Sequence, residues 1–454
     1  MSDGVMRFRE RSLTEGNITT QLILFAIPYM SANLLQALYG AVDTVVVGHF
    51  TNAAGLSAAA IGSQFMFLIN GIIIGLSMGG TILIARYFGA RSDKDIKETI
   101  GTMFTLFAIV SIILTLVMFA FVKPLVSIIQ TPPEAVSQTE GYIFISSAGI
   151  SFMFAYNALS AMLRGFGDSK SPLIFVAIAS VCNVIGDLIF VAVFKMGAPG
   201  AALATILSQG LSAVLAVIYL KKQNFHFDFK LSSFRIKAEK LKNLLYIGLP
   251  VSVQMSMTTV SFMFIMATVS IMGGVVASAA IGITSKINGF VMLPPVAFSA
   301  AISAMVSQNM GANRPKRAVR CLYTGIIVTL VFGVISFSLL QFYPAHVIEI
   351  FTPESELIYA TSQYLKSFSI DCILVCFVFC LNGFFNGCGH TRFSMVNNLM
   401  AAFLLRVPAT WFISKMPGAD LFSVGFATPL SSLLSITVGI IYLRSGKWRK
   451  LKLS

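Results

Sequence analysis

Long apolar stretches alternate with short polar segments along almost the whole chain. Each stretch contains at least about 18 mostly apolar residues, the length that an α-helix needs to cross the roughly 30 Å hydrocarbon core of a bilayer. The pattern therefore predicts an all-α integral membrane protein with twelve transmembrane helices. These helices are expected at residues 18–46, 54–80, 97–122, 138–163, 171–195, 200–221, 243–270, 276–304, 318–342, 360–386, 394–415 and 421–443.

The composition agrees with a membrane location. Of the 454 residues, 56% are hydrophobic and 11% are charged, whereas about 25% are charged in ordinary soluble proteins. The net charge of +14 would suggest nucleic acid in a soluble chain, but here its placement matters more and no nucleic-acid partner is expected. The polar start of the chain shows no cleavable signal, so the first helix is expected to stay in the lipid bilayer.

Basic residues gather in every second loop. Most of the 32 Lys and Arg residues lie in the N-terminal segment, in the loops after the even-numbered helices and in the C-terminal tail. Cytoplasmic loops are enriched in Lys and Arg. We therefore expect both termini on the cytoplasmic side of the cell (inner or plasma) membrane, and a monomer is expected.

The two halves of the chain repeat one another at an offset of 222 residues. The matched segments are RGFGDSK (164–170) with NGCGHTR (386–392), Gly89–Arg91 with Gly311–Asn313, and Ile27–Pro28 with Leu249–Pro250. Because each half contains an even number of spans, the halves have the same orientation. We expect two six-helix lobes related by a pseudo-two-fold axis along the membrane normal, as in some secondary transporters.

The repeat sets the expected domains. They are an N-lobe over residues 1–220, a cytoplasmic linker over 221–242 and a C-lobe over 243–454. Pro28 and Pro250 occupy equivalent places in the first helix of each lobe. Proline lacks an N–H donor and bends helices, so each is a candidate hinge; irregular packing alone would also explain a proline.

Three carboxylates lie inside predicted spans, where a charge costs several kcal/mol unless it faces a cavity or a partner. Asp43 of the first span and Asp187 of the fifth lie at a similar depth by helix rise. Asn183 shares the face of Asp187, and Thr205 of the sixth span lies at a comparable depth. We expect these four residues to form an ion-coupling cluster in the N-lobe.

Tyr39 and Gln36 share the helix face of Asp43. Tyr39 is expected to belong to the ion site, and Gln36 and Asp43 to contact substrate. Two neighbouring carboxylates cannot both stay ionised cheaply in a low dielectric, so we expect them to share a proton and to titrate together. Alternatively, the oxygen atoms could hold sodium. No other cofactor is expected, and a purely structural role for the acids is the remaining alternative.

Asp371 is the third carboxylate and lies in the C-lobe. It is expected either to contact a cationic substrate or couple a second ion, or to form a neutralising pair with Lys286 or Arg406. The residues equivalent to the N-lobe cluster are apolar, so only the first lobe is expected to couple to the ion. They are Ile265, Leu405 and Ala409.

Cys372, Cys376 and Cys380 share a helix face that could hold a soft metal. No His or fourth Cys joins them at ligand spacing. We therefore expect these residues to serve in packing and expect no metal site.

The chain resembles the multidrug and toxic compound extrusion (MATE) family along essentially its whole length. The resemblance rests on IPYMSANLLQALYGAVDTVVVGHF, RGFGDSK, its partner NGCGHTR, and NVIGD. The acid, amide and hydroxyl residues of the N-lobe cluster look like the cation site of the DinF-like branch. The NorM-like branch has an acid on its seventh helix, where this chain reads GLPVSVQMSMTTVSFMF. The resemblance implies a proton- or sodium-driven antiporter that expels amphipathic organic cations by alternating access.

Three alternatives remain. A flippase for a lipid-linked precursor would need a basic cavity for its anionic substrate, whereas Lys286 and Arg406 are the only cations predicted within the membrane. An enzyme would need clustered acids or a nucleophile with a base, and neither pattern occurs, so no enzyme is expected. A non-transporting membrane receptor is disfavoured by the repeat and the intramembrane acids.

Overall fold

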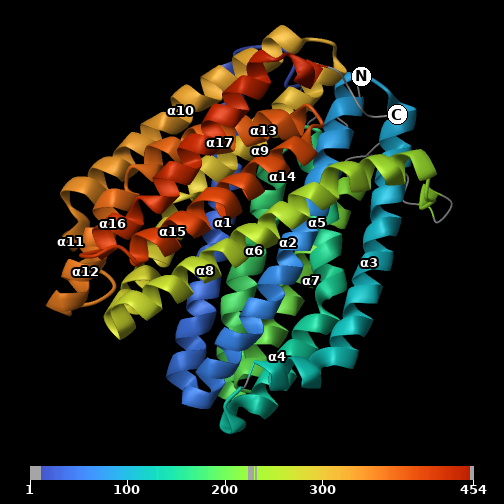
Figure 1. Cartoon of the computed structure of the whole chain (residues 1–454). Coiled ribbons are helices and arrows are strands. Elements are labelled where there is room, and N and C mark those ends of the chain that lie inside the picture. The colour runs from blue at the N-terminus through green and yellow to red at the C-terminus, as the bar shows by residue number, and fades with distance from the viewer. Residues whose placement is uncertain (1–11, 130, 223–226, 228–229, 231–232, 450–454) are drawn as a thin grey trace. The chain divides into compact units, whose positions relative to one another are not determined.

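The computed structural model describes residues 12–129, 131–222, 227, 230 and 233–449, and every regular element within them is helical (Figure 1). The predicted all-α architecture is confirmed. The elements are α1 (Ile18–Phe50), α2 (Ala53–Gly89), α3 (Asp93–Ile128), η1 (Pro133–Ala135), α4 (Val136–Ala148), α5 (Ile150–Gly165), α6 (Lys170–Asp187), η2 (Leu188–Val193), α7 (Ala198–Lys222), α8 (Ala238–Val291), α9 (Leu293–Gly311), α10 (Pro315–Phe342), α11 (Pro344–Glu349), α12 (Ser355–Phe368), α13 (Asp371–Gly387), α14 (Thr391–Met400), η4 (Ala401–Arg406), α15 (Val407–Ser414), α16 (Leu421–Gly425), α17 (Ala427–Arg444) and η5 (Lys447–Arg449).

The number of possible membrane spans agrees with the sequence pattern. Within the described residues, nine helices are long and apolar enough to cross a membrane, or eleven if each of two bent helix pairs counts as one span. The pair α4 and α5 bends by 42°, and the pair α12 and α13 bends by 48°. Helix α8 also contains non-helical backbone at Gly273 and Gly274. Dividing α8 there, and joining its second part to α9, gives the twelfth span.

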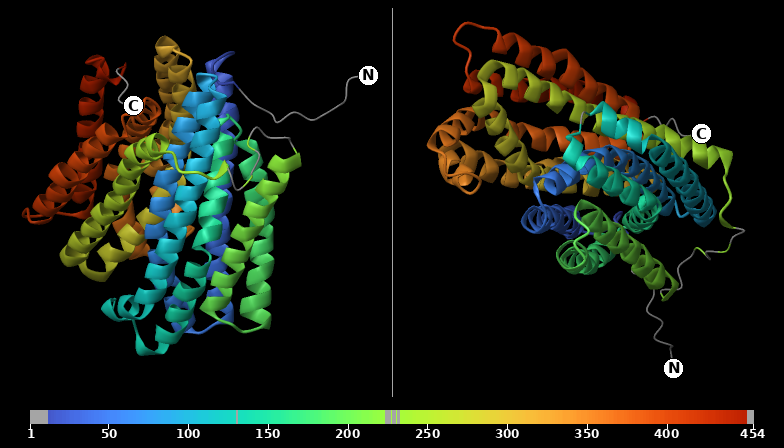
Figure 2. Two further views of the ribbon diagram at one scale, coloured as in Figure 1. Left: turned by 90° about the vertical axis from the view of Figure 1, so that its right-hand side faces the viewer. Right: turned by 90° about the horizontal axis from the view of Figure 1, so that it is seen from below.

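The chain divides into two compact units. Among the described residues, the first unit contains residue 12 and those between 27 and 248, and the second contains residues 13–26 and 249–449. The helices of the first unit lie side by side as a bundle (Figure 2). The chain passes between the units one residue before Pro28 and one residue before Pro250. Both prolines lie inside α-helices, α1 and α8.

The internal repeat extends to backbone conformation. Gly167 and Gly389 have φ values of 86° and 87°, and Arg91 and Asn313 both have a φ of 56°. Each pair is separated by 222 residues, and the backbone hydrogen bonds around the paired turns match at the same offset. Glycine adopts such left-handed conformations without steric cost. The sequence repeat is therefore also a structural repeat.

We expect Gly167→Ala and Gly389→Ala each to lower the free energy of unfolding by about 1–2 kcal/mol, because alanine is strained at these φ values. The apparent unfolding temperature of the purified protein in detergent should fall by similar amounts in both variants. Gly282→Ala is the control, since a Cβ there meets open space within α8. Unchanged unfolding temperatures in both turn variants would contradict this prediction.

The segments that precede α1 and α8 are held in the same way. In the second unit, the backbone of Leu13 donates to Gln308 Oε1 (2.8 Å), and Asn309 Nδ2 donates to the Leu13 carbonyl (3.1 Å). In the first unit, the Lys237 N–H donates to Thr102 Oγ1 (3.1 Å). These contacts anchor the first turns of each helix that runs from one unit into the other.

Close helix packing in the second unit depends on glycine. A Cβ at Gly383 of α13 would lie 2.5 Å from the carbonyl oxygen of Ser299 on α9, and one at Gly387 would lie 2.6 Å from that of Ser303. Small residues at a spacing of four let helix backbones approach closely in membranes. The α9–α13 contact therefore has no room for a side chain at either glycine.

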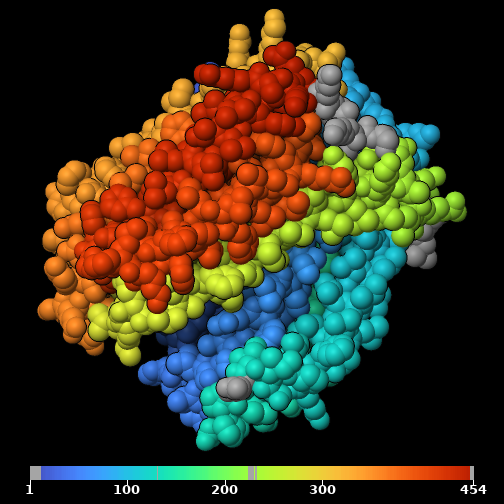
Figure 3. All heavy atoms as spheres, in the orientation of Figure 1, coloured from blue at the N-terminus to red at the C-terminus, as the bar shows by residue number. Residues whose placement is uncertain are grey.

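Large apolar side chains remain exposed on the outer helices, as a lipid-facing surface requires. The outer flank of α3, a helix that is partly visible in Figure 3, carries such residues. They include Ile109, Ile112, Ile113, Leu116 and Phe121. This surface would be unstable in water and is suited to the hydrocarbon core of a bilayer.

Candidate functional site

The structure brings Asp43, Asn183, Asp187 and Thr205 together within the first unit. The Thr205 hydroxyl of α7 donates to Asp43 Oδ2 of α1 (3.3 Å), and Asn183 Nδ2 of α6 donates to the Thr205 hydroxyl (3.4 Å). The carboxyl groups of Asp43 and Asp187 lie near enough to interact electrostatically. Helix α1 and the much later helices α6 and α7 therefore bring these side chains to one place, which we call the acid cluster.

The acid cluster is buried and rich in unsatisfied acceptors. Asp187 is 0% exposed and Asn183 is 1% exposed. Several buried oxygens accept no hydrogen bond from a described N–H or hydroxyl group: Asp43 Oδ1, both carboxyl oxygens of Asp187, Asn183 Oδ1 and Gln209 Oε1. A buried acceptor without a donor costs about 1–3 kcal/mol. A proton or a small cation bound among these oxygens would remove that cost.

A local change of helix type lies beside Asp187. Helix α6 ends at Asp187, and the chain continues as the π-helical segment η2. Each π-turn adds a residue to the helical turn, and such segments are frequent at functional sites. In the second unit the π-helical segment η4 interrupts the helix of α14 and α15 and ends at Arg406. Neither segment is apparent in the apolar pattern of the sequence.

Tyr39 also lies at the acid cluster. Gln209 Nε2 of α7 donates to the Tyr39 hydroxyl (3.4 Å). Sequence reasoning missed Gln209, although its spacing of four from Thr205 places both on one helix face. Gln36, predicted to contact substrate, makes no hydrogen bond to the cluster among the described residues.

Tyr142 of α4 is a further neighbour that the sequence did not reveal. Its ring packs over Gly62 of α2, where a Cβ would lie 2.2 Å from the ring, and its hydroxyl lies within electrostatic range of Asp43 and Asp187. No charge or spacing pattern in α4 marks this tyrosine. Only the packing of α4 against α2 shows that it lies near the acids.

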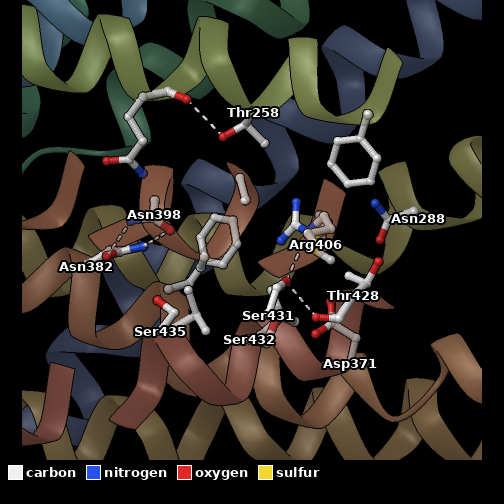
Figure 4. Close-up of a pocket in the computed structure, with 18 of the residues that line it drawn as sticks. Thr258, Asn288, Asp371, Asn382, Asn398, Arg406, Thr428, Ser431, Ser432 and Ser435 are labelled. Carbon is white, nitrogen blue, oxygen red and sulfur yellow. Dashed lines mark hydrogen bonds between the residues drawn. The ribbon is translucent and has the colours of Figure 1, made fainter. Parts of the chain in front are cut away.

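Asp371 lines a cavity of about 210 Å³ in the second unit (Figure 4). It is 3% exposed and begins α13, directly after the 48° bend. Arg406, at the end of η4, lines the same cavity and attracts Asp371 electrostatically. Lys286, the other predicted partner, is exposed on α8. Of the two basic residues considered, the structure therefore places Arg406 near Asp371.

The cysteine face of α13 packs against α10. A Cβ at Gly333 of α10 would lie 2.6 Å from Cys376 Sγ, and the Cys376 thiol also contacts the Cys372 carbonyl oxygen (3.2 Å). Cys380 Sγ lies 3.5 Å from the Thr329 hydroxyl. No group of three His, Cys, Asp or Glu side chains in the described part of the chain is arranged to hold a metal ion.

Comparison with known proteins decides the family. The family model described as MatE matches residues 28–189 and 250–412, so its two copies begin at the two repeat-equivalent prolines. The probable multidrug resistance protein YpnP of Bacillus subtilis (strain 168) is 30% identical over 444 residues, which is 97% of this chain and 98% of that protein. The chain belongs to the MatE family. The resemblance stated from the sequence is confirmed.

Other MATE proteins match over similar lengths. The probable multidrug resistance protein NorM of Thermotoga maritima is 26% identical, covering 95% of this chain and 94% of that protein. A solved structure described as the outward-facing conformation of a multidrug resistance MATE family transporter of the MOP superfamily is 20% identical. It covers 98% of this chain and 100% of that chain, with a TM-score of 0.92.

Another solved structure is described as a MOP superfamily transporter from Pyrococcus furiosus in which the reverse polarity of the binding pocket suggests a different function. It is also 20% identical with a TM-score of 0.92, covering 98% of this chain and all of that chain. These structural matches support the MATE fold. The chain is therefore a multi-pass membrane transporter of the MATE multidrug efflux family, not an enzyme.

Proposed function

We propose that this MATE protein is a secondary active exporter that couples the outward movement of amphipathic organic cations to the entry of H⁺ or Na⁺. The observation that carries the proposal is the acid cluster. Two carboxyl groups from separate helices meet among buried oxygens that lack donors. Such a set of oxygen atoms is suited to a proton or a small hard cation. The side chains also follow the pattern of the DinF-like branch.

The coupling step follows from charge. While no ion is bound, the two carboxylates repel one another in a low dielectric. Binding of a proton or sodium ion between Asp43 and Asp187 removes this repulsion, and Thr205 can then keep its hydrogen bond to Asp43. The occupied and empty clusters therefore favour different packings of α1 against α6 and α7. Ion and substrate exchange when they bind the two resulting states with different affinities.

The two prolines are the proposed hinges. Each proline lacks the backbone N–H that would donate a helix hydrogen bond. Helices α1 and α8 therefore bend more easily at Pro28 and Pro250. Both lie where the chain passes between the two compact units. Bending there would let the N-lobe and C-lobe, proposed as 1–220 and 243–454 with linker 221–242, change their relative position.

Three polar side chains are proposed to contact the substrate, and both termini are proposed to be cytoplasmic. Gln36, Asp43 and Asp371 are the proposed substrate contacts, because each is a polar side chain within a mainly apolar membrane helix. The protein is proposed to act as a monomer in the cell membrane. The basic loops support cytoplasmic termini, although residues 1–11 and 450–454 lie outside the described part of the chain.

Transport in liposomes tests the proposal. The purified protein is reconstituted, ethidium is supplied, and either a pH gradient or a sodium gradient is imposed. We expect one of the two gradients to drive ethidium across the membrane against its own gradient, because ion and cation use the same conformational cycle. An ionophore that collapses the driving gradient should stop accumulation, and protein-free liposomes give the background. Accumulation that depends on neither gradient would contradict antiport.

A further inference from the structure

We infer that the cavity of the second unit binds zwitterions, with a ligand ammonium group at Asp371 and a ligand carboxylate at Arg406. The inference rests on the proposed exporter function, since it assigns a substrate class to that transporter. It concerns a site that is chemically different from the acid cluster, because this cavity contains side chains of both charges.

Asp371 is the negatively charged group of the proposed zwitterion site. It is 3% exposed, and its Oδ1 accepts no hydrogen bond from a described donor. The Ser432 hydroxyl interacts with the carboxyl group from α17. A buried carboxylate oxygen left without a donor is costly, so an ammonium group that enters the cavity would gain a charge-assisted hydrogen bond.

Arg406 is the positively charged group of the proposed zwitterion site. Its Nε donates to the Ser431 hydroxyl (3.0 Å; Figure 4). Its guanidinium carbon lies 5.3 Å from the centre of the Phe262 ring. These two contacts hold the guanidinium plane without using Nη1 or Nη2. The two terminal nitrogens form the fork that binds a carboxylate with two parallel hydrogen bonds.

The charges of Asp371 and Arg406 are not neutralised by direct contact with each other. Asp371 and Arg406 attract one another, but they form no direct ion pair among the described residues. A buried pair that served only to neutralise charge would be in direct contact, since its desolvation cost is recovered only with good geometry. Separated charges in one cavity are suited to a ligand that carries both opposite charges.

The other polar groups of the cavity fit the same ligand class. Gln254 Oε1 and Asn288 Oδ1 line the cavity and lack a described donor. Both are acceptors, so they are suited to the N–H groups of a ligand. In contrast, Asn382 and Asn398 hydrogen-bond to each other in both directions (3.3 Å and 3.0 Å). The side chains of Asn382 and Asn398 are therefore partnered within the wall, whereas Gln254 Oε1 and Asn288 Oδ1 have no described donor and are available to a ligand.

The size and the apolar wall define the ligand further. A volume of about 210 Å³ exceeds the roughly 150 Å³ of a cavity that binds benzene, and it is smaller than typical sites for complete drug-sized ligands. Phe262, Phe368 and Met292 contribute apolar surface. The cavity thus fits the head group of an amphiphile that carries an amine and a carboxylate close together, as an amino acid does.

The test compares two probes that differ only in the carboxylate. Nε-dansyl-L-lysine is a fluorescent zwitterion, and its methyl ester is a cation of nearly the same size. Binding of each probe to the purified full-length protein is followed by dansyl fluorescence. We expect the wild-type protein to bind the free acid more tightly than the ester.

Arg406→Gln should weaken binding of the free acid by about tenfold or more, the effect of losing a charge-assisted hydrogen bond, and should leave binding of the ester nearly unchanged. Asp371→Asn should weaken both probes, because both carry the ammonium group. Lys286→Gln is the matched control, since it removes an exposed cation from the same unit. If Arg406→Gln fails to fold, Arg406→Lys replaces it and should reduce the preference, because lysine keeps the positive charge but cannot form the two-pronged contact.

Equal affinity of the wild-type protein for acid and ester would overturn the inference, and so would a preference that survives both Arg406 variants. These outcomes are separable from failure of the proposed function. A protein that selects the zwitterion but moves ethidium under neither gradient refutes antiport alone. A protein that drives ethidium but ignores the carboxylate refutes the zwitterion site alone.

Discussion

Replacing either Asp43 or Asp187 by asparagine is expected to reduce ion-driven ethidium transport to the level of protein-free liposomes. Asparagine has nearly the same shape as aspartate and can still accept the hydrogen bond from Thr205 at position 43. It carries no charge and cannot exchange a proton at neutral pH. The cluster would therefore remain close to its ion-bound condition and the cycle would stop. Transport in reconstituted liposomes under the driving gradient is the measurement.

The control for these variants is Asp93→Asn, which removes an exposed carboxylate at the start of α3 in the same unit. It should transport at the wild-type rate. Each variant must also elute as the wild-type protein does in size-exclusion chromatography, so that loss of transport is not loss of fold. If a well-folded Asp43→Asn or Asp187→Asn protein transports ethidium at the wild-type rate under the driving gradient, the acid cluster does not couple the ion to transport.

Gly383→Leu and Gly387→Leu are expected to prevent correct packing of α13 against α9. The Cβ atom alone would lie 2.5 Å or 2.6 Å from a backbone carbonyl oxygen, and a helix backbone cannot move aside as a flexible side chain can. Overpacking in a core costs up to about 3 kcal/mol, and a clash with backbone should reach at least that value. The yield of monodisperse protein extracted from membranes is the measurement, and it should fall sharply.

Gly289→Leu provides the comparison for these glycines. Gly289 is exposed on α8, and a Cβ there meets nothing within 4 Å. This variant should be recovered in wild-type amounts, because leucine is compatible with a lipid-facing helix. Normal recovery of both α13 variants would show that α9 and α13 do not require the close approach.

Much of the fold could be predicted from local sequence. The predicted spans 171–195 and 200–221 correspond to α6 with η2, which together end at Val193, and to α7. A membrane helix must be apolar over a length set by the bilayer thickness. Its presence can therefore be recognised from a run of consecutive residues. The break between α12 and α13 falls within predicted span 360–386 and was not predicted. No proline or glycine marks residues 369 and 370, so the bend depends on packing.

Some residues of the candidate site could likewise be predicted from the sequence, and others could not. Asp43 and Asp187 could be identified because a carboxylate in an apolar run is costly wherever the helix packs. Gln209 and Tyr142 could not, since glutamine and tyrosine are tolerated in many membrane helices and carry no comparable signal. The sequence also left open whether Lys286 or Arg406 would pair with Asp371, and the fold separated them by exposing Lys286 and placing Arg406 in the cavity.

By itself, the sequence determined the helices, the repeat and the buried acids of this MATE protein. Bilayer thickness and the cost of buried charge act on short stretches of consecutive residues, and the repeat is visible as matching segments 222 residues apart. Only the tertiary structure decided which helix faces meet. It gathered Asp43, Asp187 and Thr205 into one cluster and gave Asp371 a neighbouring arginine. Contacts between distant segments depend on how side chains interlock, and no local pattern contains that information.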